Sequence, residues 1–157
     1  MKLPLTGGCL CGSVRYEITG VPNMVYACHC TDCQKMSGSA FSIGVVFPEV
    51  YFRLTEGEPK PYARLAESGH RLEAWSCPIC GTRTFGSPRK GEGDAEAVRT
   101  VRGGTLDDSS WLVPSIHFWT RSAHPWVKIP DEVTSFETQP SREWIAASFR
   151  ERTILPR

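Results

Sequence analysis

The chain has 157 residues, with 18 lysine and arginine and 17 aspartate and glutamate side chains, so its formal net charge is +1. This balance argues against a strongly basic surface that binds nucleic acid or an anionic membrane, and we expect neither partner. Because no segment approaches the ~20 apolar residues of a membrane-spanning helix and the first residues lack a signal-peptide core, we expect one soluble, cytoplasmic domain over residues 1–157.

Short segments rich in β-branched and aromatic residues, separated by 14 glycines and 12 prolines, predict a mainly β protein. In the first segment Val14, Tyr16 and Ile18 alternate with polar residues, which indicates a strand with one buried face. The predicted strands are residues 13–19, 23–27, 40–47, 50–54, 71–76, 97–106 and 115–119. No βαβ rhythm is present, so we expect antiparallel sheets.

Helix signals are few. Thr31 could cap a short turn that runs to Met36. Ser141 is a favourable N-cap for a C-terminal helix over residues 141–152, in which Ile145 and Phe149 share a face. Residues 87–97 are charged and contain glycine, which is typical of a loop.

Seven cysteines are the unusual feature of the composition. An odd number cannot pair completely within one chain, and no export signal indicates an oxidising compartment, so metal ligation is favoured over disulfides. The cysteines form three groups, namely Cys9 with Cys11, Cys28 with Cys30 and Cys33, and Cys77 with Cys80.

The group C-P-x-C-G at Cys77 and Cys80 resembles half of a zinc site. Proline fixes the turn, and Gly81 can adopt the positive φ that follows the second ligand. Two more ligands are needed, and the glycine-flanked pair of Cys9 and Cys11 can supply them, which gives a closed structural site of four thiolates. The alternative is that Cys9 and Cys11 are small core residues.

Cys28, Cys30 and Cys33 would then remain for a second metal that is one ligand short of tetrahedral. A closed site would need a histidine, but the side chain of His29 would point away from both neighbouring cysteines in an extended segment. The other histidines could reach the site only through tertiary folding, and they are His70, His117 and His124. We favour an open site whose fourth position takes water or substrate.

The ordered segments "GGCLCGSVRYEITG", "CHCTDCQKMSGSAF", "CPICGT" and "GTLDD…HFWTRSAHPWV" resemble the glutathione-dependent formaldehyde-activating enzyme family, which includes centromere protein V. The resemblance covers about residues 7–137. It implies a tent-like β fold with two zinc ions per chain, one structural and one catalytic. The structural zinc would be held by Cys9, Cys11, Cys77 and Cys80, and the catalytic zinc by Cys28, Cys30 and Cys33. The implied reaction joins glutathione and formaldehyde as S-(hydroxymethyl)glutathione, which makes the family carbon–sulfur lyases in the reverse direction.

This chemistry suits three thiolates, because a zinc ion that carries them is a weak Lewis acid for water but a good acceptor for a fourth thiolate. A thiol bound there would lose its proton and could attack a small aldehyde. His117 could serve as general acid, with Trp119 on the same face of its strand lining a pocket. Arg121 or Lys35 could pair with the carboxylates of glutathione.

Other neighbours of the triplet are assigned more ordinary roles. His29 and Asp32 could orient the ligands, although we favour solvent exposure for both. Ser37 and Ser39 are expected to shape a turn, and Trp126 is expected to serve in packing. A non-catalytic zinc module is the main alternative to an enzyme. A C-x-x-C redox protein is disfavoured because the strands offer no βαβ setting, and an iron–sulfur cluster fits the paired spacings less well than zinc.

Overall fold

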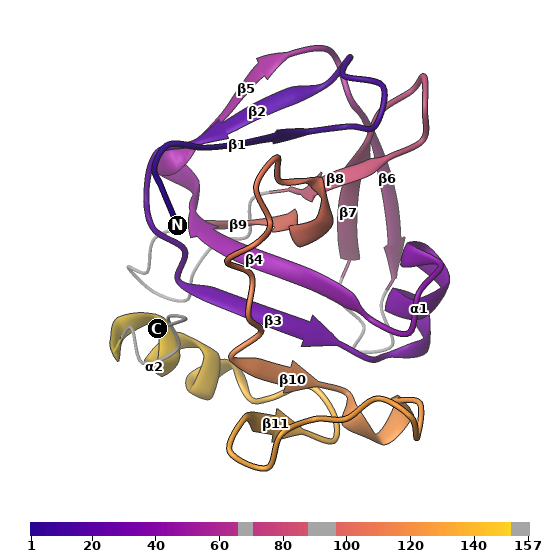
Figure 1. The fold of residues 1–157 in the computed structure, drawn as a ribbon, viewed down its shortest axis with the longest axis vertical. Helices are drawn as coiled ribbons and strands as arrows, with labels where there is room; N and C mark the ends of the chain where they lie inside the picture. Colours follow the sequence, from indigo (N-terminus) through magenta and orange to yellow (C-terminus); the bar gives the residue numbers. More distant parts are fainter. Residues whose placement is uncertain (66–70, 88–96, 152–157) are drawn as a thin grey trace.

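The computed structural model describes residues 1–65, 71–87 and 97–151, which form two sheets, two α-helices and short 3₁₀ turns (Figure 1). The smaller sheet has the order β1-β2-β5, and its strands are β1 (Leu5–Gly8), β2 (Arg15–Ile18) and β5 (Phe52–Glu56). The larger sheet has the order β11-β10-β3-β4-β9-β8-β7-β6. Its strands are β3 (Met24–Cys28), β4 (Ser42–Pro48), β6 (Lys60–Leu65), β7 (Arg71–Ser76), β8 (Arg83–Gly86), β9 (Val98–Arg102), β10 (Ile116–Phe118) and β11 (Thr134–Phe136).

The predicted mainly β fold is confirmed, and each of the seven predicted strands overlaps an observed one. The pairing is antiparallel in most of the structure, but β10 pairs in parallel with both β3 and β11. Four short strands were not predicted, namely β1, β6, β8 and β11. Their sequences LTGG, KPYARL, RTFG and TSF carry too little alternation to signal a strand, so pairing with neighbours determines their structure.

The main core lies between the two sheets. Tyr16 and Ile18 of β2 are buried there against Val45 and Phe47 of β4, as the alternation in the sequence predicts. Val14 is also buried, but it packs against Cys9 and Cys77 instead.

Helix α2 (Arg142–Glu151) confirms the predicted C-terminal helix and lies beside β3 and β10 (Figure 1). The backbone N–H of Trp144 donates to Ser141 Oγ at 3.1 Å, which is the predicted N-cap contact. Trp144 and Phe149 pack against a second apolar cluster that includes Ile116 and Phe118. Among the described residues, no helix has the length and apolar character needed to cross a bilayer.

Replacing Ser141 with alanine is expected to lower the free energy of unfolding by about 1 kcal/mol, because the capped N–H of Trp144 loses its acceptor. Urea denaturation followed by circular dichroism measures this change. Ser135→Ala is the matched control, since Ser135 is exposed on β11. An equal effect of both substitutions would contradict the capping role.

Candidate metal centres

The first cysteine cluster joins the two sheets. Cys9 and Cys11 follow β1 of the smaller sheet, whereas Cys77 and Cys80 lie between β7 and β8 of the larger one. All four sulfurs lie within 4.8 Å of one another. The Sγ atoms of Cys9 and Cys11 are 3.5 Å apart and those of Cys11 and Cys77 are 3.8 Å apart. A tetrahedral zinc ion with Zn–S bonds of about 2.3 Å requires S–S separations of about 3.8 Å, so this cluster could hold zinc.

Local backbone geometry arranges these sulfurs. Gly81 has φ +73°, the left-handed conformation expected after the second cysteine of C-P-x-C-G. The N–H of Val14 donates to Cys9 Sγ at 3.2 Å. The N–H of Leu10 donates to Thr82 Oγ1 at 3.2 Å, which ties the two cysteine turns together.

Hydroxyl groups favour the thiolate forms of two cysteines in this cluster, Cys80 and Cys11. Hydrogen bonding to Thr82 lowers the pKa of Cys80 to about 5. Hydrogen bonding to Ser13 likewise lowers the pKa of Cys11. Because the thiolate is the form of cysteine that binds metal, these contacts suit metal ligation.

The second cluster is built around helix α1 (Thr31–Ser37), next to the end of β3 (Figure 1). The sulfurs of Cys28, Cys30 and Cys33 lie within 4.8 Å of one another, and the Sγ atoms of Cys28 and Cys30 are 3.6 Å apart. The prediction that Thr31 caps this helix is wrong by one residue. Cys30 is the N-cap, and its sulfur accepts a hydrogen bond from the N–H of Cys33 at 3.4 Å. The helix turn therefore brings the two sulfurs of C-x-x-C together.

Within residues 1–65, 71–87 and 97–151, no histidine, cysteine or carboxylate joins this cluster as a fourth ligand. His29 Nε2 is hydrogen-bonded to His117 Nδ1 at 2.8 Å. His124 is exposed and stacks on Trp126 at a centroid separation of 5.8 Å. His70 lies outside the described residues. Three sulfurs without a further described ligand are compatible with an open metal site.

His29 is completely buried, so the expectation that it is exposed to solvent is wrong. Burial lowers its pKa to about 4 and also lowers the pKa of His117. Both rings are therefore neutral near pH 7, with one nitrogen donating to the other. None of the described hydrogen bonds joins His117 to a cysteine sulfur, and its role as general acid stays a prediction.

The other residues that were expected near the three-cysteine cluster have different contacts in the structure. Asp32 is partly exposed and forms an ion pair with Arg64 of β6, which ties α1 to the sheet. The Ser37 hydroxyl donates to the carbonyl of Cys33 at 2.8 Å, so it shapes the end of the helix as expected. Ser39 is exposed and lines a cavity next to α1, and Lys35 is exposed on α1.

Neither tryptophan has the role that the sequence predicts. Trp119 was expected to line a pocket, but it is buried in the apolar cluster beneath α2. Trp126 was expected to pack, but it is 69% exposed and stacks on His124. The Arg121 guanidinium lies 4.9 Å from the ring centroid of Trp119, in a cation–π contact.

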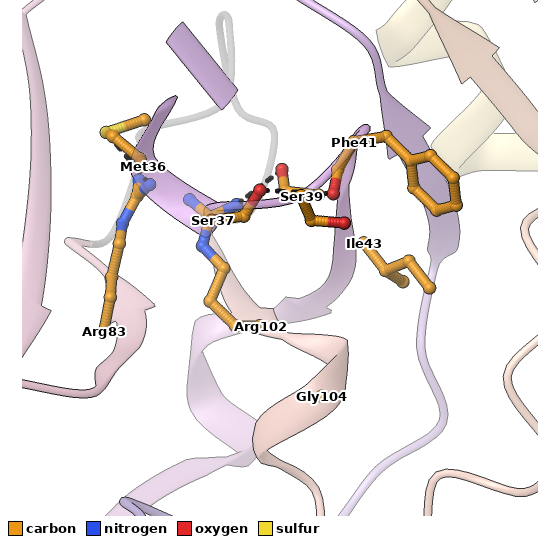
Figure 2. A pocket seen from close by; sticks show the side chains of 9 residues that line it. Met36, Ser37, Ser39, Phe41, Ile43, Arg83, Arg102 and Gly104 are labelled. Atoms are coloured by element: carbon orange, nitrogen blue, oxygen red, sulfur yellow. Dashed lines mark hydrogen bonds between the residues drawn. The ribbon is translucent and has the colours of Figure 1, made fainter. Parts of the chain in front are cut away.

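A cavity of about 360 Å³ adjoins the three-cysteine cluster. Its lining includes Met36 and Ser37 of α1, Ser42 of β4, Arg83 of β8 and Arg102 of β9 (Figure 2). Ser42 lies directly opposite Cys28 in the β3–β4 register and thereby connects the cavity to the sulfurs.

Positive charge is concentrated at this cavity. Hydrogen bonds from the neighbouring thiols Cys28 and Cys30 lower the pKa of Cys33, and Ser42 and Arg102 lower it further. Burial lowers the pKa of Arg83 to about 10, and the positive charge of Arg102 contributes. Neither arginine was predicted from the sequence. In the sequence each of them is only a charged residue in a short strand. The pairing of β4 with β9 and of β9 with β8 brings them together.

Sequence comparisons relate this chain to one family of proteins. The family model described as glutathione-dependent formaldehyde-activating enzyme (GFA) matches residues 4–122. A Penicillium rubens protein that is provisionally named a glutathione-dependent formaldehyde-activating enzyme is 30% identical over 80% of this chain and 66% of its own length. A Podospora anserina protein with the same provisional name is 32% identical over 49% of this chain and 36% of its own length. The chain thus spans less than two thirds of these curated relatives.

A crystal structure of a Rhodobacter sphaeroides protein superposes with a TM-score of 0.48 at 19% identity, covering 65% of this chain and 87% of that one. This likeness is too low to support an argument. The family model, in contrast, covers well over half of the sequence and all seven cysteines that form the two clusters. The chain therefore belongs to the glutathione-dependent formaldehyde-activating enzyme family.

Proposed function

We propose that this protein is a zinc-dependent carbon–sulfur lyase that forms and cleaves adducts of a thiol with a small aldehyde, with glutathione and formaldehyde as the substrates. The observation that carries the proposal is the cluster of Cys28, Cys30 and Cys33. It has no fourth ligand among the described residues, and it lies beside a cavity. The provisional names of the family relatives support the choice of substrates.

The two clusters have different roles in this proposal. Cys9, Cys11, Cys77 and Cys80 would hold a structural zinc ion, since four sulfurs complete a tetrahedron. Zinc held by Cys28, Cys30 and Cys33 would supply a soft Lewis acid that stabilises the thiolate form of a substrate thiol.

The chain's own residues orient this second site. Cys28 is fixed by β3, and Cys30 and Cys33 are fixed by the first turn of α1. Gln34 anchors the turn, because its side-chain Nε2 donates to the carbonyls of His29 and Ser122, each at 2.8 Å.

In the reaction, the thiolate sulfur forms a bond to the aldehyde carbon while the π electron pair of the carbonyl moves to oxygen. The oxygen then takes up one proton, equal to the proton that the thiol released, so the addition is balanced without an oxidant or reductant. Cleavage follows the same path in reverse. His117 remains our proposed proton donor to this oxygen. Because its ring is neutral near pH 7, it would first take up the proton that the thiol releases and then donate that proton to the oxygen.

Exchange NMR with glutathione and ¹³C-formaldehyde tests the activity. We expect the zinc-loaded protein to accelerate exchange between the free aldehyde and S-(hydroxymethyl)glutathione above the spontaneous rate, in proportion to protein concentration. Exchange without protein is the reference for the spontaneous reaction. No acceleration, together with no binding of the thiol, would refute the enzyme and favour the non-catalytic zinc module.

A further inference from the structure

The two arginines of the cavity lack strong acceptors. Arg83 Nη1 donates to the thioether sulfur of Met36 at 3.1 Å, and a thioether is a weak acceptor. Arg102 Nη1 donates to Ser42 Oγ at 3.4 Å, which is long for a hydrogen bond. The Nε atoms of both arginines are buried without a partner among the described residues.

Arg99 on the same strand as Arg102 shows how this fold satisfies an arginine that it uses structurally. Its Nε and Nη2 atoms each lie 2.7 Å from a carboxylate oxygen of Glu49, and its guanidinium lies 4.4 Å from the ring centroid of Phe52. None of the ion pairs in the described part of the chain includes Arg83 or Arg102.

The geometry of the cavity brings these two charges together, and neither has a carboxylate partner among the described residues. Figure 2 shows both guanidinium groups directed toward the segment that carries Met36 and Ser37. Two half-buried guanidinium groups that face one cavity repel each other, and a bound anion relieves the repulsion.

We propose that Arg83 and Arg102 form an oxyanion subsite that binds a carboxylate of the thiol substrate while its sulfur occupies the three-cysteine site. This inference rests on the proposed function and defines its substrate class as thiols that carry a carboxylate. A carboxylate matches the planar fork of a guanidinium better than a neutral group does, so the subsite selects against uncharged thiols. The subsite is an alternative to carboxylate binding by Arg121 or Lys35, which the sequence suggested and which stays a prediction.

The subsite is compatible with the size and position of the cavity. A volume of about 360 Å³ lies within the range of small-molecule sites, roughly 300–1,000 Å³. Ser42 accepts a hydrogen bond from Arg102 and lies opposite Cys28 in the β3–β4 register, so an anion bound at the arginines would lie next to the three-cysteine cluster.

Binding of glutathione and of its diethyl ester to the zinc-loaded protein, measured by calorimetry, tests the subsite. The two ligands carry the same thiol, but the ester has no carboxylate. We expect wild-type protein to bind glutathione roughly tenfold or more tightly than the ester, because hydrogen bonds between charged groups are strong. Arg102→Gln and Arg83→Gln are expected to reduce this preference to about twofold or less. Arg53→Gln, which alters an arginine of the smaller sheet that is paired with Glu17, should retain it.

An equal affinity of the wild type for the two ligands would overturn the subsite, and this comparison needs no variant that might misfold. A preference that persists in both Arg83→Gln and Arg102→Gln would also overturn it. If these substitutions lower only the zinc content, the arginines merely balance the charge of the thiolates, and the subsite is refuted. If the protein prefers glutathione to the ester but does not accelerate exchange, the subsite stands and the lyase is refuted. If it accelerates the exchange of both thiols and binds them equally well, the lyase stands and the subsite is refuted.

Discussion

Cys77→Ser is expected to prevent stable folding. Cys77 is buried in the four-sulfur cluster, and its replacement removes one of the four proposed zinc ligands that would join β1 of the smaller sheet to the β7–β8 turn of the larger one. Structural zinc sites contribute apparent binding free energies of about 10–16 kcal/mol in small zinc modules. That contribution is as large as the whole stability of a typical domain, about 5–15 kcal/mol.

Thermal denaturation and zinc analysis of the purified protein measure this effect. We expect Cys77→Ser to show no cooperative unfolding transition at room temperature or above. Ile79→Ser is the matched control, because Ile79 lies in the same turn but is 73% exposed and does not ligate. A cooperative transition of Cys77→Ser close to that of the wild type would show that the cluster does not stabilise the fold.

Cys30→Ser is expected to abolish thiol–aldehyde exchange while the fold survives. The substitution removes one of three sulfurs from the proposed open zinc site, and a catalytic metal contributes several kcal/mol, so the exchange rate should fall roughly 100-fold or more. Cys30 is also the N-cap of α1. Serine is a favoured N-cap residue, so the helix keeps its cap and the variant should fold.

Exchange NMR, zinc content and circular dichroism together measure this outcome. The variant should retain about one zinc ion and a native far-ultraviolet spectrum. Thr31→Ser, an exposed change one residue along the same helix, is the control and should keep both zinc ions and full activity. If Cys30→Ser and Cys77→Ser fail in the same way, the two clusters do not have separate roles.

Local patterns in the sequence were enough to predict much of this structure. The grouping of cysteines at short spacings, with Gly81 after the knuckle, fixes the sulfur geometry within a turn. The alternation around Tyr16 and the N-cap at Ser141 likewise depend only on neighbouring residues, and both are observed.

Features that depend on distant strands could not be predicted. His29 pairs with His117 because β10 lies parallel to β3, a connection across some 88 residues of sequence. This pairing explains why His29 is buried and not exposed. The cavity arginines Arg83 and Arg102 meet because β8 and β9 are neighbours in the larger sheet, and no local pattern encodes that order.

A crystal structure of zinc-loaded protein soaked with glutathione, with anomalous data at the zinc edge, tests the division between a closed and an open site most directly. The account predicts two anomalous peaks, one within four protein sulfurs and one within the sulfurs of Cys28, Cys30 and Cys33 with the glutathione sulfur as fourth ligand. A protein side chain such as His70 in that fourth position, or no peak at the three-cysteine cluster, would contradict it.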